Sequence, residues 1–184
     1  MIVEDTAFAG LKIITPARIE DHRGMFSEVY NRRSFEEVGI DLVFVQDNHS
    51  RSLEAGTVRG LHFQAPPYAQ DKLVRVIRGR ILDVSVDIRA SSPTFGQHFA
   101  IELSADNWRQ MLVPVGFAHG FCTLEAHAEV LYKATNYYSP AHEMGLAWDD
   151  PVLGIRWPVA AGVVVLSNKD RRLPLLKDLP PAFG

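Results

Sequence analysis

The chain has 184 residues, a length that predicts one domain with a sizeable hydrophobic core. Its composition, 47% hydrophobic and 22% charged, is that of an ordinary globular protein and excludes a disordered or fibrous one. The net charge of −3 gives no general electrostatic reason to bind nucleic acid or an anionic membrane.

Cysteine content and the first residues bear on the compartment. Cys122 is the only cysteine, which excludes an internal disulfide and a thiolate zinc site within one chain. The opening MIVEDTAFAGLKII is acidic where a signal peptide is basic. No apolar run approaches the roughly 20 residues that span a bilayer. We therefore expect a cytoplasmic protein with no membrane contact.

One short helix is expected in the N-terminal part of the chain. Ser34-Phe35-Glu36-Glu37 resembles a capping box, which marks a helix start. Gly39 is placed to end a helix of about one turn.

Strands dominate the remainder of the chain. Segments rich in β-branched and aromatic residues are separated by turn residues and cover 72–77, 80–89, 99–103, 109–115, 129–138 and 162–167. The first two meet at Arg78-Gly79, where we expect a tight hairpin turn. Such a series predicts an all-β fold, a sandwich or jelly-roll barrel with few short helices. No repeat or linker divides residues 1–184, so we expect one domain, with a proline-rich surface tail from about residue 173.

The stretch Arg59-Gly60-Leu61-His62 places two polar side chains beside apolar neighbours. In a regular strand His62 shares a face with Gly60 and Gln64, while Arg59 falls on the opposite face. A bulge at Gly60 would turn both Arg59 and His62 inward, because glycine inside a strand often marks a bulge. A lone histidine in such a place is otherwise a satisfied core residue.

Two further polar residues fall on inner faces. Lys72 shares its face with Val74 and Val76, which is unfavourable unless that face lines a wet or ligand-filled cavity, or the side chain reaches a rim. Tyr132 and Tyr138 likewise belong to the inner face of their strand. Each has an alternative interpretation as an amphipathic core residue with a satisfied polar tip.

Histidine spacing argues against a metal site. Metal-dependent barrels of the cupin type carry His-x-His, and here Gln64 stands where the second ligand would be. His62 and His119 are too few for a stable site without added carboxylates. The other histidines, His22, His49, His98, His127 and His142, are expected at the surface.

Several motifs, taken together, resemble those of the dTDP-4-dehydrorhamnose 3,5-epimerases over residues 1 to about 178. They are Asp21-x-Arg23-Gly24-x-Phe26-x-Glu28, Gln46-Asp47-Asn48-His49-Ser50, Arg59-Gly60-Leu61-His62-Phe63-Gln64, Ala69-Gln70-x-Lys72-Leu73-Val74, Asp83-Val84-x-Val86-Asp87-x-Arg89, Ser92-Pro93-Thr94-Phe95-Gly96, Gly116-Phe117-Ala118-His119-Gly120-Phe121, Tyr132-Lys133 and Leu166-Ser167-x-Lys169-Asp170. The turn at residues 52–56 looks one residue longer than in some members.

This resemblance implies a metal-free cupin jelly roll without a cofactor, usually a homodimer. It also implies inversion of carbons 3 and 5 of a dTDP-linked 4-keto-6-deoxyhexose, a step toward dTDP-L-rhamnose. Both carbons flank a ketone, so each proton can leave to form an enolate. By the resemblance, His62 is the base, oriented by Asp170, and Tyr132 returns a proton from the opposite face. Lys72 stabilises the enolate oxygen.

The resemblance further implies a nucleotide site at the barrel mouth. It assigns the diphosphate to Arg23, Arg59, Gln46 and Asn48, thymine stacking to Phe26 and Tyr138, nucleotide hydrogen bonds to Glu28, and a place in the sugar cavity to His119.

Three alternatives stay open at this point. A sister enzyme that inverts only carbon 3 or carbon 5, or acts on another dTDP-deoxysugar, would share these residues. A non-catalytic nucleotide-sugar-binding barrel would be expected to lack the base or the acid. A metal-dependent cupin dioxygenase would bind a transition metal. For the homodimer, the N-terminal segment is a candidate to pair with the exposed sheet edge of a second copy.

Overall fold

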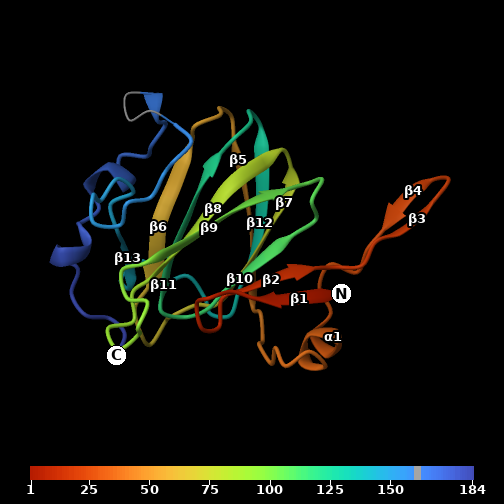
Figure 1. The fold of residues 1–184 in the computed structure, drawn as a ribbon, viewed down its shortest axis with the longest axis horizontal. Helices are drawn as coiled ribbons and strands as arrows, with labels where there is room; N and C mark the ends of the chain where they lie inside the picture. Colours follow the sequence, from red (N-terminus) through yellow and green to blue (C-terminus); the bar gives the residue numbers. More distant parts are fainter. Residues whose placement is uncertain (160–162) are drawn as a thin grey trace.

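Two β-sheets packed face to face form the body of the protein (Figure 1), as seen in a computed structural model that describes residues 1–159 and 163–184. The six-stranded sheet has the order β1-β2-β10-β7-β12-β5, and the five-stranded sheet has the order β13-β6-β11-β8-β9. All the pairings within these sheets are antiparallel. The predicted all-β sandwich of jelly-roll type is confirmed.

The strands of the first sheet are β1 (Ile2–Asp5), β2 (Lys12–Thr15), β5 (Gln46–Ser52), β7 (Lys72–Arg78), β10 (Gln110–Val113) and β12 (Ala128–Ala134). Those of the second are β6 (Val58–Gln64), β8 (Arg80–Asp87), β9 (His98–Ser104), β11 (Phe117–Thr123) and β13 (Glu143–Gly145). The strands predicted at 72–77 and 99–103 are therefore confirmed, and those predicted at 80–89, 109–115 and 129–138 form with shorter ends. Tyr138 consequently lies beyond the end of β12 and not on its inner face, contrary to the prediction.

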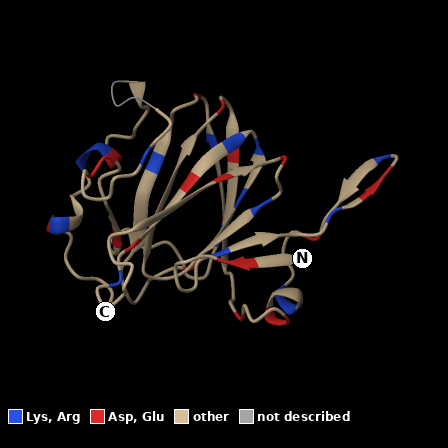
Figure 2. Ribbon diagram, viewed as in Figure 1, with Lys and Arg blue, Asp and Glu red and all other residues tan. Residues whose placement is uncertain are grey.

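The hydrophobic core lies between the sheets. Side chains from the inner faces of both sheets, among them Val74, Val130, Leu103 and Phe121, form one buried cluster. Full burial of each such side chain stabilises the fold by about 1.5–3 kcal/mol. Figure 2 shows positive and negative residues interleaved along the chain, in keeping with the small net charge.

The predicted hairpin at Arg78-Gly79 is wrong. β7 pairs with β10 and β12, whereas β8 pairs with β11 and β9, so the chain changes sheets at this turn. Gly79 adopts a left-handed φ of 71° there. Two consecutive strands with one apolar face each can pair side by side or pack face to face, and here they pack face to face.

The predicted strand at 162–167 is also not formed over its described part; Gly162 lies outside the described residues. From Val163 onward the segment makes one isolated bridge, between Val165 and Thr57. The segment is apolar because Val164 and Leu166 pack against a small cluster around Val58 and Trp148, and not because it belongs to a sheet.

Helix α1 (Arg32–Glu36) is the α-helix of the described residues, and its start differs from the prediction. Asn31, not Ser34, is the N-cap: its side chain accepts hydrogen bonds from the Arg33 and Ser34 backbone N–H groups at 3.0 and 3.4 Å. Asn31 is an equally good cap and lies one turn earlier. Gly39, at a φ of 81°, follows the helix end as predicted. No helix in the described ranges is long and apolar enough to cross a membrane.

A two-stranded hairpin projects from the body (Figure 1). It consists of β3 (Ile19–Asp21) and β4 (Gly24–Phe26), and we call residues 19–26 the arm. Every residue of both strands is exposed, including Ile19 and Phe26, each at 67%. At the other end of the chain, Leu176, Leu179 and Phe183 of the proline-rich tail pack against a buried cluster that includes Phe63.

Candidate active site

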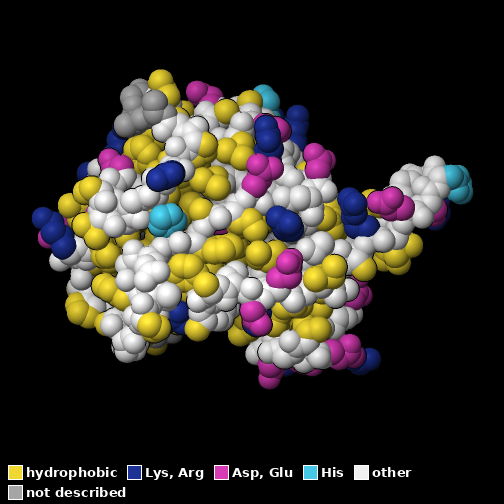
Figure 3. Space-filling model, in the orientation of Figure 1, with side chains coloured by type: hydrophobic (Ala, Val, Ile, Leu, Met, Phe, Trp, Pro, Cys, Tyr) yellow, Lys and Arg dark blue, Asp and Glu magenta, His cyan; other side chains and the backbone are white. Residues whose placement is uncertain are grey.

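A cavity of about 760 Å³, counted with its open mouth, lies between the two sheets. Its lining comes from the inner faces of β5, β6, β7, β11 and β12 and from the segment after Leu166: Ser50, Arg59, His62, Lys72, His119, Gly120, Phe121, Val130, Tyr132, Ser167, Lys169 and Asp170. All four predicted catalytic residues are in this set. Over β6, Figure 3 shows a histidine beside a basic side chain, bordered by hydrophobic ones.

A bulge in β6 brings Arg59 and His62 to the cavity together. His62 lies opposite His119 and Arg59 opposite Phe121, so two residues of β6 face the single Gly120. Gly60 adopts a φ of 120°, and a Cβ there would lie 2.6 Å from the Cα of Gly120. The predicted bulge is confirmed, and only glycine fits at its centre.

His62 is paired with a buried carboxylate. Its Nε2 lies 2.7 Å from Oδ1 of Asp170, whose residue exposure is only 4%. Burial acts to raise the pKa of Asp170, but hydrogen bonds from His62, the Gly60 backbone and Ser167 together lower it. The carboxylate therefore stays ionised at neutral pH and fixes the ring of His62, as an orienting acid does in other catalytic pairs.

Lys72 and Tyr132 face this pair from the opposite sheet. The Nζ of Lys72 donates to the His62 carbonyl at 3.3 Å and lies 6.0 Å from the centre of the Tyr132 ring. Burial lowers the pKa of Lys72 to about 8, against the attraction of Glu143 and Asp83. Burial and the charge of Glu143 raise the pKa of Tyr132, so its phenol stays protonated. Lys72 therefore lines the cavity, which is one of the two positions expected for it, and does not reach out to a rim.

His119 belongs to a second pair that sequence reasoning did not identify. Its Nε2 lies 2.8 Å from Oδ2 of Asp83, and both residues are buried. Asp83 stood in a matched motif, but nothing in its spacing linked it to a histidine 36 positions away. His119 therefore presents a fixed ring to the cavity beside His62, its partner in the strand register.

Gln64 stands where a second metal ligand would be, and its side-chain amide is hydrogen-bonded to backbone groups. Its Nε2 donates to the carbonyls of Tyr68 and Tyr137, at 2.6 and 3.1 Å, and its Oε1 accepts from the Ser139 N–H at 2.7 Å. These bonds hold the loops on either side of the cavity end of β6. Over residues 1–159 and 163–184, no group of three or more His, Cys, Asp or Glu side chains is arranged to hold a metal ion.

Three predicted nucleotide-binding residues, Gln46, Asn48 and Tyr138, are joined by hydrogen bonds that reach the cavity lining through Glu143 and Lys169. Gln46 and Asn48 are bonded to each other at 3.0 Å, and Gln46 Oε1 accepts from the Tyr138 N–H at 3.0 Å. The hydroxyl of Tyr138 donates to Glu143 at 2.6 Å, and Glu143 forms an ion pair with Lys169. Glu143 and Lys169 were not predicted; Lys169 adjoins Asp170 in a matched motif, whereas Glu143 carries no local signal.

Arg59 is held at the same cavity with its guanidinium partly free. Its Nε donates to Ser52 Oγ at 3.0 Å and one Nη to the Arg51 carbonyl at 3.1 Å. The remaining N–H groups are available to an anion, and phosphate oxygens match the arginine fork well.

Three predicted site residues are not brought to the cavity within one chain. Arg23 and Phe26 lie on the exposed arm, and Arg23 is paired with its neighbour Asp21 at 2.6 Å. Glu28 lies beside helix α1, where it accepts from Ser34 Oγ at 3.4 Å. The assignment of these three residues to the nucleotide site therefore stays a prediction, because within one chain the arm points away from the body (Figure 1).

The arrangement suits proton transfer to and from a flat carbon centre. A histidine base lies on one sheet and a protonated phenol on the other, with an ammonium next to both. A sugar ring between the sheets would meet the base on one face and the acid on the other. The ammonium would meet an oxygen that gains negative charge, which is where such a group lowers a barrier.

Comparison with known proteins identifies the family of this chain. The model of the dTDP-4-dehydrorhamnose 3,5-epimerase family matches residues 5–178. The epimerase of that name from Salmonella typhimurium is 52% identical over 177 residues, which cover 96% of each chain. The crystal structure of the Bacillus anthracis enzyme, with TDP and PPi bound, is 53% identical with a TM-score of 0.92 and covers 95% of this chain and 98% of that one.

A third relative is bound to a sugar nucleotide. The dTDP-6-deoxy-D-glucose-3,5-epimerase of Legionella pneumophila, in complex with dTDP-4-keto-L-rhamnose, is 46% identical with a TM-score of 0.92. The match covers 97% of this chain and 94% of that one. The chain is an epimerase, and it belongs to the dTDP-4-dehydrorhamnose 3,5-epimerase family.

Proposed function

We propose that this protein inverts carbons 3 and 5 of dTDP-4-keto-6-deoxy-D-glucose. The observation that carries the proposal is the opposed placement of the His62–Asp170 pair and the Tyr132–Lys72 pair across one cavity. No metal or cofactor is needed in this scheme, since the ketone of the substrate already makes both protons acidic.

Each inversion takes two proton transfers. His62 removes the proton from carbon 3 or 5, and the electron pair moves onto the carbon 4 oxygen to form an enolate. Lys72 stabilises that oxygen with its ammonium. Tyr132 then gives its phenolic proton to the carbon from the opposite face. His62 is left protonated and Tyr132 deprotonated, and exchange with solvent restores both before the second carbon reacts.

The carboxylate of Asp170 acts through His62. As the proton arrives, the imidazole becomes cationic, and the ionised Asp170 at 2.7 Å stabilises that charge. Asp83 holds His119 in a fixed orientation in the same cavity, where its other ring nitrogen is placed to bond a sugar oxygen. The nucleotide lies at the border made by Gln46, Asn48, Arg59 and Tyr138.

We further propose a homodimer in which the arm of one chain completes the nucleotide site of a second copy. Ile19, Met25 and Phe26 are large apolar side chains exposed on a projecting hairpin (Figure 3), an arrangement that is unfavourable in an isolated chain. In the dimer, Arg23 would meet the diphosphate and Phe26 the thymine. Glu28, next to the arm, would bond the nucleotide. A cytoplasmic location agrees with the single, buried thiol of Cys122.

Product analysis tests the proposed function against its nearest alternative. The purified protein is incubated with dTDP-4-keto-6-deoxy-D-glucose in D₂O, and the sugar is followed by NMR. Deuterium at both carbons, with inversion at both, supports a 3,5-epimerase. Inversion at one carbon alone identifies a single-carbon enzyme, and binding without exchange identifies a non-catalytic barrel.

A further inference from the structure

Both ends of the arm are attached to the body through one aromatic residue, Trp108. It lies in the loop between β9 and β10 and contacts the chain just before β3 and just after β4. The guanidinium carbon of Arg18 lies 5.8 Å from the centre of the indole, and the indole N–H donates to Ser27 Oγ at 3.3 Å. Trp108 therefore contacts the segment that leads into the arm and the segment that leaves it.

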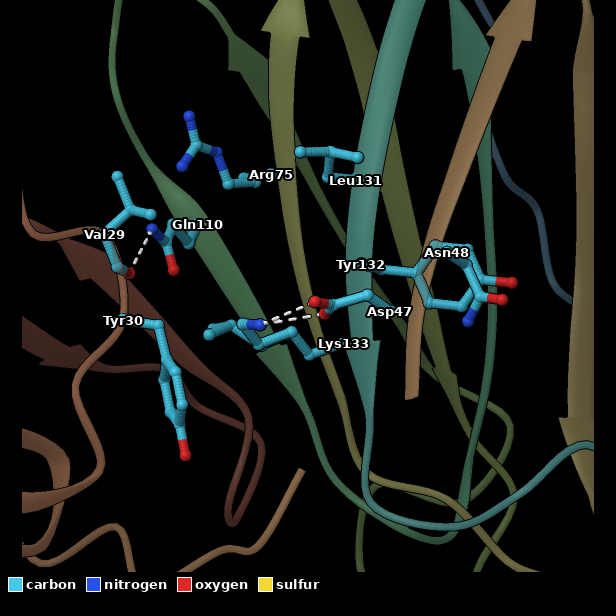
Figure 4. A pocket seen from close by; sticks show the side chains of 10 residues that line it. Val29, Tyr30, Asp47, Asn48, Arg75, Gln110, Leu131, Tyr132 and Lys133 are labelled. Carbon is cyan, nitrogen blue, oxygen red and sulfur yellow. Dashed lines mark hydrogen bonds and ion pairs between the residues drawn. The ribbon is translucent and has the colours of Figure 1, made fainter. Parts of the chain in front are cut away.

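On the body side, this contact is anchored by residues of the six-stranded sheet. Arg75, from β7, lies over the same indole at 5.4 Å, so the ring contacts two guanidinium groups. The neighbouring Gln110, only 2% exposed, donates to the Val29 carbonyl at 2.9 Å, two residues beyond Ser27 (Figure 4). Cation–π contacts and these bonds together fix the base of the arm against the six-stranded sheet.

The loop that carries Trp108 is held tightly in turn. The Asn107 side chain accepts from the Ser104 and Arg109 N–H groups, each at 3.1 Å, and donates to the Glu102 carbonyl at 2.9 Å. Trp108 itself has a φ of 62°. This left-handed conformation suits glycine or asparagine and is unfavourable for a bulky residue, so the indole occupies the position against the preference of the backbone.

We propose that Trp108 is a positioning residue, which sets the direction of the arm and thereby the nucleotide affinity of the cavity that the arm completes. The inference rests on the proposed function, in which the arm reaches a second copy. Trp108 is not among the residues that line the cavity, so it has no direct contact with the reacting sugar there. It therefore affects dTDP binding and KM, while kcat stays unchanged.

The test replaces Trp108 by asparagine, which accepts the left-handed backbone and removes the indole. Trp108→Phe is the conservative variant, which keeps an aromatic face and loses the N–H donor. Asp106→Asn is the matched control in the same exposed loop, because the Asp106 side chain makes no hydrogen bond or ion pair across the described residues. Ser27→Ala removes the acceptor from the arm side and serves if the loop variants do not fold.

Arm movement can be measured directly because the chain has one cysteine and it is buried. His22→Cys, at the arm tip, gives a single exposed thiol for a fluorescent dye, and dye anisotropy reports arm mobility. In Trp108→Asn we expect lower anisotropy and a dissociation constant for dTDP raised at least about tenfold, the lower limit for the loss of two cation–π contacts and a hydrogen bond. The KM rises by a similar factor, kcat is unchanged, and Trp108→Phe recovers part of the affinity.

Two results would overturn the inference. Unchanged anisotropy in Trp108→Asn means that the indole does not fix the arm. Increased mobility with unchanged dTDP affinity means that arm direction does not set affinity. Arg23→Ala separates this failure from failure of the proposed function: if Arg23→Ala weakens dTDP binding and Trp108→Asn does not, the arm has its proposed role and the positioning inference alone is wrong.

Discussion

Replacing Lys72 by methionine should make the protein more stable and nearly inactive. Methionine keeps a long flexible side chain against Val74 and Tyr132 but removes the buried charge. Burial lowers the pKa of Lys72 from 10.5 to about 8, so the folded state disfavours the ammonium. A difference of this size corresponds to about 3 kcal/mol of stability lost at neutral pH.

The sign of the effect follows from the order of the two pKa values. The unfolded chain keeps this proton up to about pH 10.5, whereas the folded chain releases it near 8. The destabilisation by Lys72 is therefore complete below pH 8 and is recovered as the pH rises from 8 to 10.5. Lys72→Met should be more stable than the wild type at pH 7, and the difference should shrink toward pH 10.

Urea unfolding at pH 7 and pH 10, at equal protein concentration, measures this difference. Turnover of the dTDP-4-keto sugar should fall by about 10²–10³, the usual loss when an oxyanion-stabilising group is removed. The turnover rate of the wild type should fall as the pH rises through about 8, where Lys72 loses its proton. This fall should be absent in Lys72→Arg, whose guanidinium stays charged. A methionine variant no more stable than the wild type, or a stability difference independent of pH, would show that the buried ammonium of Lys72 does not destabilise the fold.

Three further predictions concern the chemistry. His62→Ala should abolish epimerisation and the exchange of both ring protons with D₂O, at a loss of about 10²–10⁴ in rate, while dTDP binding by calorimetry is retained; exchange at the wild-type rate would identify another base. Tyr132→Phe should exchange a carbon 3 or 5 proton faster than it forms inverted sugar, whereas the wild type couples the two; normal inversion would mean that another group is the acid. Dialysis against EDTA should leave turnover intact, since Gln64 replaces a histidine ligand, and activity lost and then restored by a divalent metal would contradict the metal-free mechanism.

Local patterns predicted much of the cavity. Alternation along a strand placed Lys72 and Tyr132 on inner faces, and a glycine inside a strand located the bulge that brings Arg59 and His62 together. These inferences succeeded because side-chain direction in a strand depends on residues one or two positions away. Resemblance to a family added Asp170, which the alternation of side chains along a strand did not connect to His62.

Features that depend on distant pairing were not predictable in the same way. The sequence around Gly79 is compatible both with β8 pairing beside β7 and with β8 lying in the other sheet, as it does. The apolar run after residue 162 packs against side chains from other segments and does not extend a sheet. Asp83 acquires its partner His119 only when β8 pairs with β11, and Glu143 meets Lys169 only when the segment before Asp170 folds against it. The position of Arg23 and Phe26 depends on the direction of a whole hairpin.

The bonding of Gln64 also bears on how barrels of this kind diverge. A histidine at position 64 would complete the His-x-His spacing, yet the amide of Gln64 holds Tyr68, Tyr137 and Ser139 through three backbone hydrogen bonds. Imidazole offers at most one donor and one acceptor when neutral, so it cannot replace all three. A lineage, or a protein engineer, that moves from proton transfer to metal chemistry in this barrel must rebuild two loops as well as change one ligand.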